Sequence, residues 1–171
     1  MDSVVTDPTI DPKDLRKALG HFVTGVTVIT TRGVSGDLAG LTVNSFSSLS
    51  LLPPLVTWSI ALSAASFAAF ETCSHFIVNV LAEDQIQQAE RFAQSGGDKF
   101  KDLLVRESIA GIPLLDGVAA SFACRVAARY PGGDHTIMVG EVLAYERSER
   151  APLLYARGRY CRLGDVKRAV G

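Results

Sequence analysis

The order of apolar and polar residues along the chain predicts mostly strands, separated by short turns. Residues 23–31 are β-branched almost throughout, which favours an extended backbone. Residues 32–37 (RGVSGD) predict a turn, so this strand and the next should pair as a hairpin. The ranges predicted as strands are 23–31, 38–47, 55–62, 75–81, 119–130, 136–146 and 153–163, with 109–115 either a strand or an extended loop.

Helical signals are fewer and lie between these strands. Asp11 and Pro12 are typical of an N-cap and a first helical position. Leu15, Leu19 and Phe22 follow at helical spacing and predict one apolar face to about residue 22. Further helices are predicted over 63–70, entered through a serine cap, and over 83–93, ended by glycines 96–97, with one or two helical turns over 99–104.

These elements amount to six or seven strands and two to four helices, which favours a mainly β (α+β) fold. The strands follow one another through short turns, so we expect a mostly antiparallel barrel with helices over its ends. Strands and helices do not alternate regularly and no GxGxxG is present, which disfavours a doubly wound parallel sheet. We expect one domain over 12–165, a flexible N-terminal arm over 1–11 and a C-terminal tail over 166–171.

Residues 40–54 (GLTVNSFSSLSLLPP) differ from the other predicted strands. Apolar side chains there alternate with hydroxyls and one amide, no residue is charged, and two prolines end the stretch. A strand running into a loop would carry such a pattern, and its hydroxyls and peptide N–H groups could bind a polar, mostly uncharged ligand or an oxyanion. The same pattern also fits a serine-rich strand edge with a turn, where the hydroxyls satisfy the backbone.

Composition and charge exclude several classes of protein. Hydrophobic residues make up 47% of the 171 residues, which fits a globular domain and not a disordered chain. The net charge of −1, without a basic stripe, disfavours nucleic-acid binding. No apolar run reaches the roughly 18 residues that a membrane helix needs. The N-terminus carries Asp2, Asp7 and Asp11 and does not resemble a signal peptide, so we expect a cytoplasmic protein.

Cysteine and histidine are sparse and scattered. Cys73, Cys124 and Cys161 form no CxxC pair, and their number is odd, so buried or idle thiols in a reducing cytoplasm are expected. The histidines lie at positions 21, 75 and 135. This spacing predicts no metal site.

Several short motifs, taken together, resemble a known family. Residues 42–46 (TVNSF), followed by 48–54 (SLSLLPP), resemble the flavin-binding signature of the short-chain flavin reductases. The other matching segments, in the family's order, are 25–30 (GVTVIT), 76–81 (FIVNVL), 132–135 (GGDH), 139–142 (VGEV) and 152–155 (PLLY). The resemblance covers about residues 12–163. It implies an FMN-binding split β-barrel, a homodimer, and the reductase component of a two-component monooxygenase.

The resemblance also assigns a flavin site, with FMN or FAD as cofactor. The assigned residues are Thr42, Val43, Asn44, Ser45, Ser48, Ser50, Ser66 and Phe67. Asn44 can donate and accept hydrogen bonds at the pyrimidine edge of the ring, while the serines suit the ribityl chain and phosphate. Family members often carry a basic residue after the third strand, but residues 61–67 (ALSAASF) offer only hydroxyls and a helix N-terminus. The choice between FMN and FAD stays open.

The resemblance places the nicotinamide of NADH or NADPH beside His135 and Tyr160, with His135 as the catalytic residue. A histidine on a glycine turn can donate to a carboxamide or carry a proton near neutral pH. The same residues also fit a plain hairpin turn with an exposed histidine. Tyr155 and Tyr160 could equally pack in the core, and Arg157, Arg159 and Arg162 could lie on a solvated strand face.

Three hypotheses of function follow. The first is an NAD(P)H-dependent flavin reductase that passes a hydride from the nicotinamide to FMN or FAD and supplies reduced flavin to a separate oxygenase. The second is a flavin-binding electron carrier of the same fold without NAD(P)H turnover. The third is a protein similar to pyridoxamine-phosphate oxidase, which would need a more basic phosphate site than the sequence shows.

Overall fold

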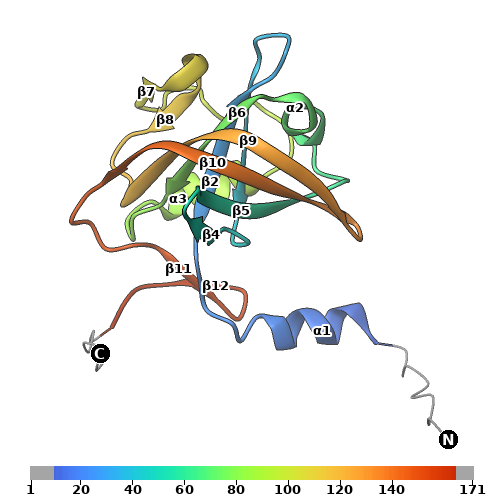
Figure 1. The fold of residues 1–171 in the computed structure, drawn as a ribbon. Helices are drawn as coiled ribbons and strands as arrows, with labels where there is room; N and C mark the ends of the chain where they lie inside the picture. The colour runs from blue at the N-terminus through green and yellow to red at the C-terminus, as the bar shows by residue number, and fades with distance from the viewer. Residues whose placement is uncertain (1–9, 165–171) are drawn as a thin grey trace, which may run out of the picture.

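The computed structural model describes residues 10–164 and is built on one seven-stranded antiparallel sheet. The order of its strands is β3-β2-β6-β9-β10-β5-β4, and Figure 1 shows the sheet curling on itself, with β9 and β10 crossing in front of β2. The strands are β2 (Thr27–Arg32), β3 (Leu38–Val43), β4 (Ser47–Leu51), β5 (Pro54–Ala61), β6 (His75–Val80), β9 (Ala120–Gly132) and β10 (His135–Arg147). The predicted mainly β, mostly antiparallel barrel is confirmed.

The remaining strands form two small sheets. One has the order β1-β11-β12, formed by β1 (Thr24–Gly25), β11 (Leu154–Ala156) and β12 (Arg159–Cys161); the other pairs β7 (Val105–Glu107) with β8 (Pro113–Leu115). Residues 109–115 were expected to form a strand or an extended loop. Only β8 is a strand there, because a 3-10 turn occupies Ile109–Gly111. The hairpin of β11 and β12 lies on the α1 side of the barrel in Figure 1.

Two predicted strands are divided, and each division has a visible cause. The strand predicted over 23–31 breaks at Val26, whose N–H donates to Leu153 while its carbonyl accepts from Leu81. Val26 is buried and turns the chain from the small sheet into the main one. The strand predicted over 153–163 is a hairpin, because Arg157 and Gly158 both take positive φ angles and reverse the chain.

The strand predicted over 38–47 ends at Val43, and β4 then begins at Ser47. Residues 44–46 therefore lie outside both strands. The Ser45 hydroxyl donates to the carbonyl of Ser59 at 3.2 Å and accepts from its N–H at 3.0 Å. These two bonds join the end of β3 to β5, which do not pair directly in the sheet.

The three α-helices are α1 (Pro12–Leu19), α2 (Phe67–Thr72) and α3 (Ile86–Ala93). The predicted N-cap is confirmed, since the Asp11 carboxylate accepts from the N–H of Lys13 at 2.9 Å. The helix predicted over 63–70 begins only at Phe67, and Ser66 makes no capping bond through its side chain. The helical turns predicted over 99–104 were wrong, since that segment contains turns and no helix.

The predicted apolar face of α1 does not enter the core of this chain. No residue of α1 is buried, and Leu15 and Leu19 are 44% and 65% exposed. Figure 1 shows α1 extending away from the barrel. The arm predicted over 1–11 lies outside the described residues except for its last two positions, and the tail over 166–171 lies wholly outside them.

The core of the barrel contains three fully buried aromatic side chains. Trp58 meets the rings of Phe70 and Phe76 edge-on, at centroid distances of 5.1 and 5.7 Å. Helix α3 packs on β3, where the Thr42 hydroxyl donates to the carbonyl of Ala89 at 2.6 Å. These contacts fix the end of β3 between core and helix.

Among residues 10–164, no helix has the length and hydrophobicity to cross a membrane.

Candidate functional site

A cavity of about 520 Å³ opens at the end of β3, and we name it the β3 cavity. Three segments line it: the end of β3 with the residues after it, β5 with the turn that follows it, and the β9–β10 hairpin. Its lining residues are Leu41, Thr42, Val43, Asn44, Ser45, Ser59, Ala61, Ala64, Gly132, His135 and Ile137. The structure therefore brings together five of the predicted site residues, those at 42–45 and His135, from segments about 90 residues apart in sequence.

Some polar side chains of the β3 cavity already form hydrogen bonds within the chain, and others do not. The Thr42 hydroxyl is engaged by Ala89 and the Ser45 hydroxyl by Ser59, so both hold the wall in place. The Asn44 side chain has no hydrogen-bond partner within the described part of the chain. Its amide is the one that can donate and accept toward a ligand without breaking an existing bond.

Asn44 also lies where three hollows meet. It lines the β3 cavity, a smaller space of about 210 Å³ with Tyr155 and Tyr160, and a hollow of about 850 Å³ beneath α1. The rings of Tyr155 and Tyr160 meet edge-on at 5.6 Å, and both pack against the core beside α3. Tyr160 is thus a neighbour of Asn44 and not of His135 in the lining of these spaces.

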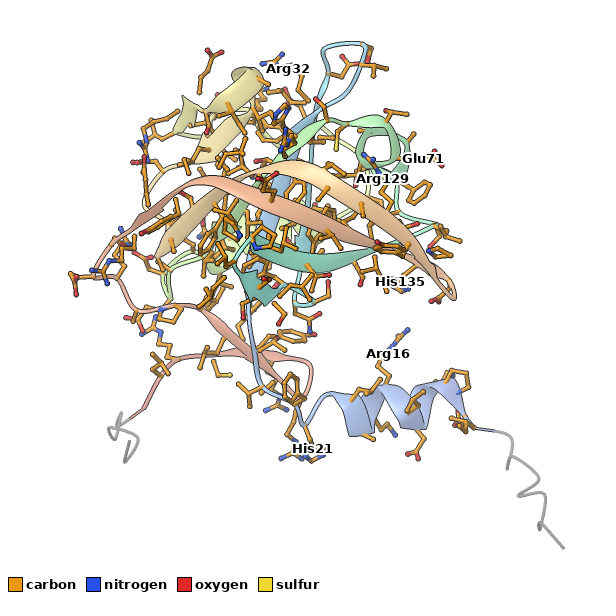
Figure 2. All side chains as sticks on the ribbon, viewed as in Figure 1. Arg16, His21, Arg32, Glu71, Arg129 and His135 are labelled. Carbon is orange, nitrogen blue, oxygen red and sulfur yellow. The ribbon has the colours of Figure 1, made fainter. Side chains whose placement is uncertain are left out.

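His135 begins β10 and directly follows the tight turn of Gly133 and Asp134, in which Gly133 has a φ of 68°. Its ring Nδ1 lies 2.6 Å from the Asp134 carboxylate, and the bond to His135 holds the pKa of that carboxyl below its usual range. With Nδ1 engaged, Nε2 is the nitrogen left for a ligand. Figure 2 shows His135 near the end of the β9–β10 hairpin, with Glu71 and Arg129 away from it.

The four remaining predicted flavin residues lie outside the β3 cavity. Ser48 and Ser50 are on the edge strand β4, where Ser48 is exposed and Ser50 half-buried. Ser66 lies just before α2 and lines a neighbouring hollow of about 690 Å³. Phe67 is half-buried and packs against the aromatic core. Their assignment to the flavin stays a prediction.

The hollow beside Ser66 contains a residue that the sequence did not indicate. Lys99 lies there, with Nζ donating to the carbonyls of Gly40 and Phe92, each at 3.2 Å. Partial burial lowers the pKa of this ammonium group. Two of its N–H donors are used and one remains, so Lys99 places a cation in the hollow beside Ser66, whereas residues 61–67 carry none. The glycine pair at 96–97 was the signal in the sequence for a turn before Lys99. In the structure both glycines take positive φ angles.

The two hollows are neighbours along the same segments. Leu41 and Ala64 line the β3 cavity, and the adjacent Gly40 and Ala65 line the hollow with Lys99. The two hollows therefore follow one another along β3 and along the segment after β5. Within residues 10–164, no three His, Cys, Asp or Glu side chains are close enough together to hold a metal ion.

Comparison with known proteins gives one family. The family model described as "Flavin reductase like domain" matches residues 19–164. The chain is 44% identical over 150 residues to an FMN reductase (NADH), SmoA, of Agrobacterium fabrum, covering 88% of this chain and 85% of that protein. It is 41% identical to the reductase component of a flavin-dependent trigonelline monooxygenase of Acinetobacter baylyi, of which it spans about half, 48%.

A solved structure agrees with these similarities. The NADH:FAD oxidoreductase SgcE6 of Streptomyces globisporus C-1027 superimposes with a TM-score of 0.86 at 36% identity. The match covers 94% of this chain and 99% of that one. The same fold therefore extends over almost all of the residues described here.

Proposed function

The chain belongs to the flavin reductase-like family, and on that premise we propose that it is an NADH:flavin oxidoreductase. The observation that carries the proposal is the β3 cavity, whose lining combines apolar walls, hydroxyls and the unbonded amide of Asn44, without a lysine, arginine or carboxylate. Its volume of about 520 Å³ lies within the range of roughly 300–1,000 Å³ usual for small-molecule sites. Such a lining fits an uncharged ring system. When bound, a flavin accepts a hydride at N5 from a reduced nicotinamide.

Each part of the wall has a proposed task. Asn44 binds the pyrimidine edge of the ring through its amide. Thr42 and Ser45 keep the wall rigid through their bonds to Ala89 and Ser59. Ser66 and Lys99 bind the flavin phosphate in the neighbouring hollow, where a charge-assisted contact is stronger than a neutral one.

His135 is proposed to orient the nicotinamide. Its bond to Asp134 fixes the ring and leaves Nε2 to meet the carboxamide. Hydride transfer moves no proton from the protein, so His135 need only position the substrate. Tyr160, on the other side of Asn44, remains a proposed contact of the nicotinamide nucleotide.

Relatives support NADH as the reductant and an oxygenase as the consumer of reduced flavin. SmoA is named an FMN reductase (NADH), and SgcE6 an NADH:FAD oxidoreductase. Two relatives are named as reductase parts of monooxygenases, that of Acinetobacter baylyi and the HsaB subunit of Rhodococcus jostii. We infer that this chain reduces FMN or FAD with NADH and releases it to a separate oxygenase.

A second copy of the chain is the other proposed partner. The α1 helix buries none of its residues, and an isolated helix of eight residues is too short to be stable in water. Leu51, the last residue of β4, and Leu52, in the turn that follows, are 91% and 93% exposed. Apolar surface of this kind is typical of an interface. We therefore propose a homodimer.

The test is NADH oxidation with and without added FMN or FAD, together with flavin titration of Asn44→Ala. Loss of a buried hydrogen bond to the ring costs about 1–3 kcal/mol, so flavin affinity should fall at least several-fold while the fold is kept. Ser47→Ala is the matched control, since the Ser47 hydroxyl is exposed and bonds only to the Ser48 carbonyl.

The outcomes separate the competing functions. Flavin-dependent NADH oxidation supports the reductase. Tight flavin binding without NADH oxidation would instead support an electron carrier of the same fold. Unchanged flavin affinity in a folded Asn44→Ala protein would remove Asn44 from the site.

A further inference from the structure

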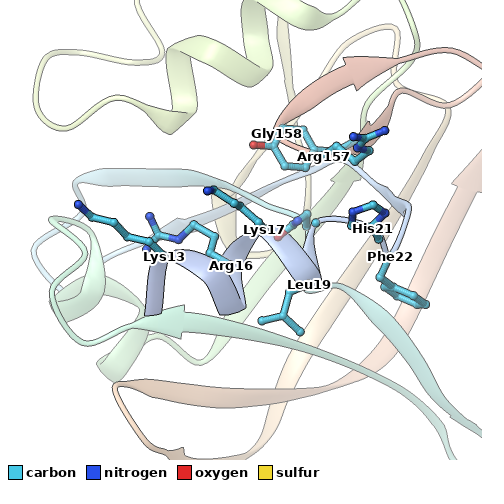
Figure 3. A pocket seen from close by; sticks show the side chains of 11 residues that line it. Lys13, Arg16, Lys17, Leu19, His21, Phe22, Arg157 and Gly158 are labelled. Atoms are coloured by element: carbon cyan, nitrogen blue, oxygen red, sulfur yellow. The ribbon is translucent and has the colours of Figure 1, made fainter. Parts of the chain in front are cut away.

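The largest of these hollows, about 850 Å³, lies between α1 and the turn that joins β11 to β12. We name it the basic hollow. Four cationic side chains line it, Lys13, Arg16 and Lys17 from α1 and Arg157 from the turn, and no aspartate or glutamate does. Figure 3 shows Lys13, Arg16 and Lys17 along one side of α1, with Lys17 the nearest of them to the turn of Arg157 and Gly158.

The cations of the basic hollow have no counter-ions in the chain as described. Ion pairs within residues 10–164 use Arg106, Arg125, Arg150 and His135, and none uses a residue of this hollow. Like charges three and four residues apart on a helix repel one another. Lys13, Arg16 and Lys17 have this spacing, so an anion bound among them would relieve the repulsion.

Arg157 is held in place at a conformational cost. Its φ of 52° is left-handed, and with Gly158 at 77° it forms a hairpin turn of the kind that asparagine and glycine prefer. Its N–H donates to the carbonyl of Gly20 at 2.6 Å, which fixes the turn against the end of α1. An arginine kept in such a backbone conformation suggests that its side chain serves a function.

The position of the basic hollow decides which anion it would meet. Along β3, the hollow with Lys99 lies beside Gly40, the β3 cavity beside residues 41–45, and the basic hollow beside Asn44. If the flavin phosphate lies at the Lys99 end, the basic hollow lies at the opposite end of the ring site. It is therefore placed for the second substrate and not for the flavin.

We propose that the basic hollow binds the diphosphate bridge of the nicotinamide dinucleotide. The inference rests on the proposed function and adds the site that holds the non-reacting half of NADH. Arginine guanidinium groups bind phosphate oxygens in a bidentate manner, and Arg16 and Arg157 provide two of them. Phe22 lines the same hollow and gives the adenine base an aromatic surface.

The experiment uses the double variant Arg16→Gln/Lys17→Gln of the full chain. The KM for NADH should rise about tenfold, the size expected for two exposed charge-assisted contacts. Reduction by benzyl-dihydronicotinamide, which has no phosphate, should proceed at the wild-type rate, and FMN should bind with unchanged affinity. The matched control is Lys101→Gln/Arg147→Gln, which removes the same charge from exposed positions outside the hollow.

Titration with ADP-ribose tests the site without turnover. This probe has the diphosphate bridge but no nicotinamide, so it should bind the wild type and the control variant and bind Arg16→Gln/Lys17→Gln about tenfold more weakly. An unchanged KM for NADH together with unchanged ADP-ribose binding would overturn the proposal. So would weaker binding of FAD with unchanged binding of FMN and NADH, because the hollow would then hold the adenylate of FAD.

The two proposals can fail separately. If the wild type does not oxidise NADH with any flavin, the proposed function fails, and ADP-ribose binding still reports on the hollow. Arg157→Asn provides a second variant, in which asparagine suits the left-handed turn. Its melting temperature should stay at or above the wild-type value while the KM for NADH rises about threefold. A lower melting temperature with an unchanged KM would make Arg157 purely structural.

Discussion

Asp134 engages one ring nitrogen of His135, which leaves the other nitrogen to make one hydrogen bond to a ligand. The loss of that single bond sets the effect expected of a substitution at His135. We expect His135→Ala to raise the KM for NADH, lower turnover, or both, by about threefold to tenfold, the worth of one neutral hydrogen bond. Flavin affinity should change little. Stopped-flow flavin reduction against NADH concentration, at several pH values, measures this.

Two results would contradict that role. A loss of about 10²–10⁴-fold that depends on pH would make His135 an obligate proton donor. Identical saturation curves for variant and wild type would place His135 outside the site and leave the glycine turn with a structural role.

Cys124 gives a second prediction at the scale of one residue. Burial raises the pKa of its thiol from 9.0 to about 12. Above pH 9 the unfolded chain loses this proton while the folded chain keeps it, so the free energy of unfolding should fall as pH rises toward 12. The slope should be at most about 1.4 kcal/mol per pH unit. Urea unfolding between pH 8 and 10.5 measures it, and Cys124→Ala should show a flatter dependence; equal slopes would refute the assignment.

Which site residues the sequence could predict depended on how they come together. The residues at 42–45 are adjacent in one unusual stretch that carries the family resemblance, so they were predicted together, and the same resemblance assigned His135 on its glycine turn. Lys99 contacts Gly40, which lies 59 residues earlier in the sequence, and no local sequence pattern predicts that contact. The basic residues of α1 likewise became a cluster only when the β11–β12 turn brought Arg157 to them.

Strands that pair with another strand on both sides were predicted with nearly correct bounds. The structure has strands at 75–80, 120–132 and 135–147 where strands were expected over 75–81, 119–130 and 136–146. Each of these strands pairs with a neighbour on both sides, so its residues are held extended over most of its length. The ranges 23–31 and 153–163 were each one apolar run, and only long-range bonds to Val26 and a left-handed turn divided them.

The packing of β10 beside β9 and against the Phe76 ring of β6 is close, and it can be tested at Gly140. A Cβ there would overlap the ring of Phe76 and lie 3.0 Å from the Cβ of Cys124. Gly140→Ala should therefore lower the free energy of unfolding by about 1–3 kcal/mol, as overpacking does. Gly25→Ala is the control, because a Cβ at Gly25 meets nothing within 4 Å. Thermal or urea unfolding decides it, and equal stability of the two variants would contradict the packing.

A single chain leaves apolar surface exposed to water, which a second copy of the chain would cover in the proposed homodimer. The sequence predicted an apolar face on α1, and in the structure Leu15 and Leu19 of that face remain exposed. Local spacing could show that the helix has such a face but not what covers it. Leu51 and Leu52 add a second exposed apolar site, at the end of β4.

Sedimentation or light scattering at micromolar concentration should therefore give a homodimer. Leu51→Glu/Leu52→Glu should shift it toward monomer, because burying an unpaired carboxylate in an interface is unfavourable. Val34→Glu is the control: Val34 is 85% exposed, in the turn between β2 and β3, on the side of the barrel away from α1 in Figure 1. A wild-type chain that is monomeric and fully active would contradict the homodimer. A dimer that both variants leave intact would instead place the interface away from the turn after β4.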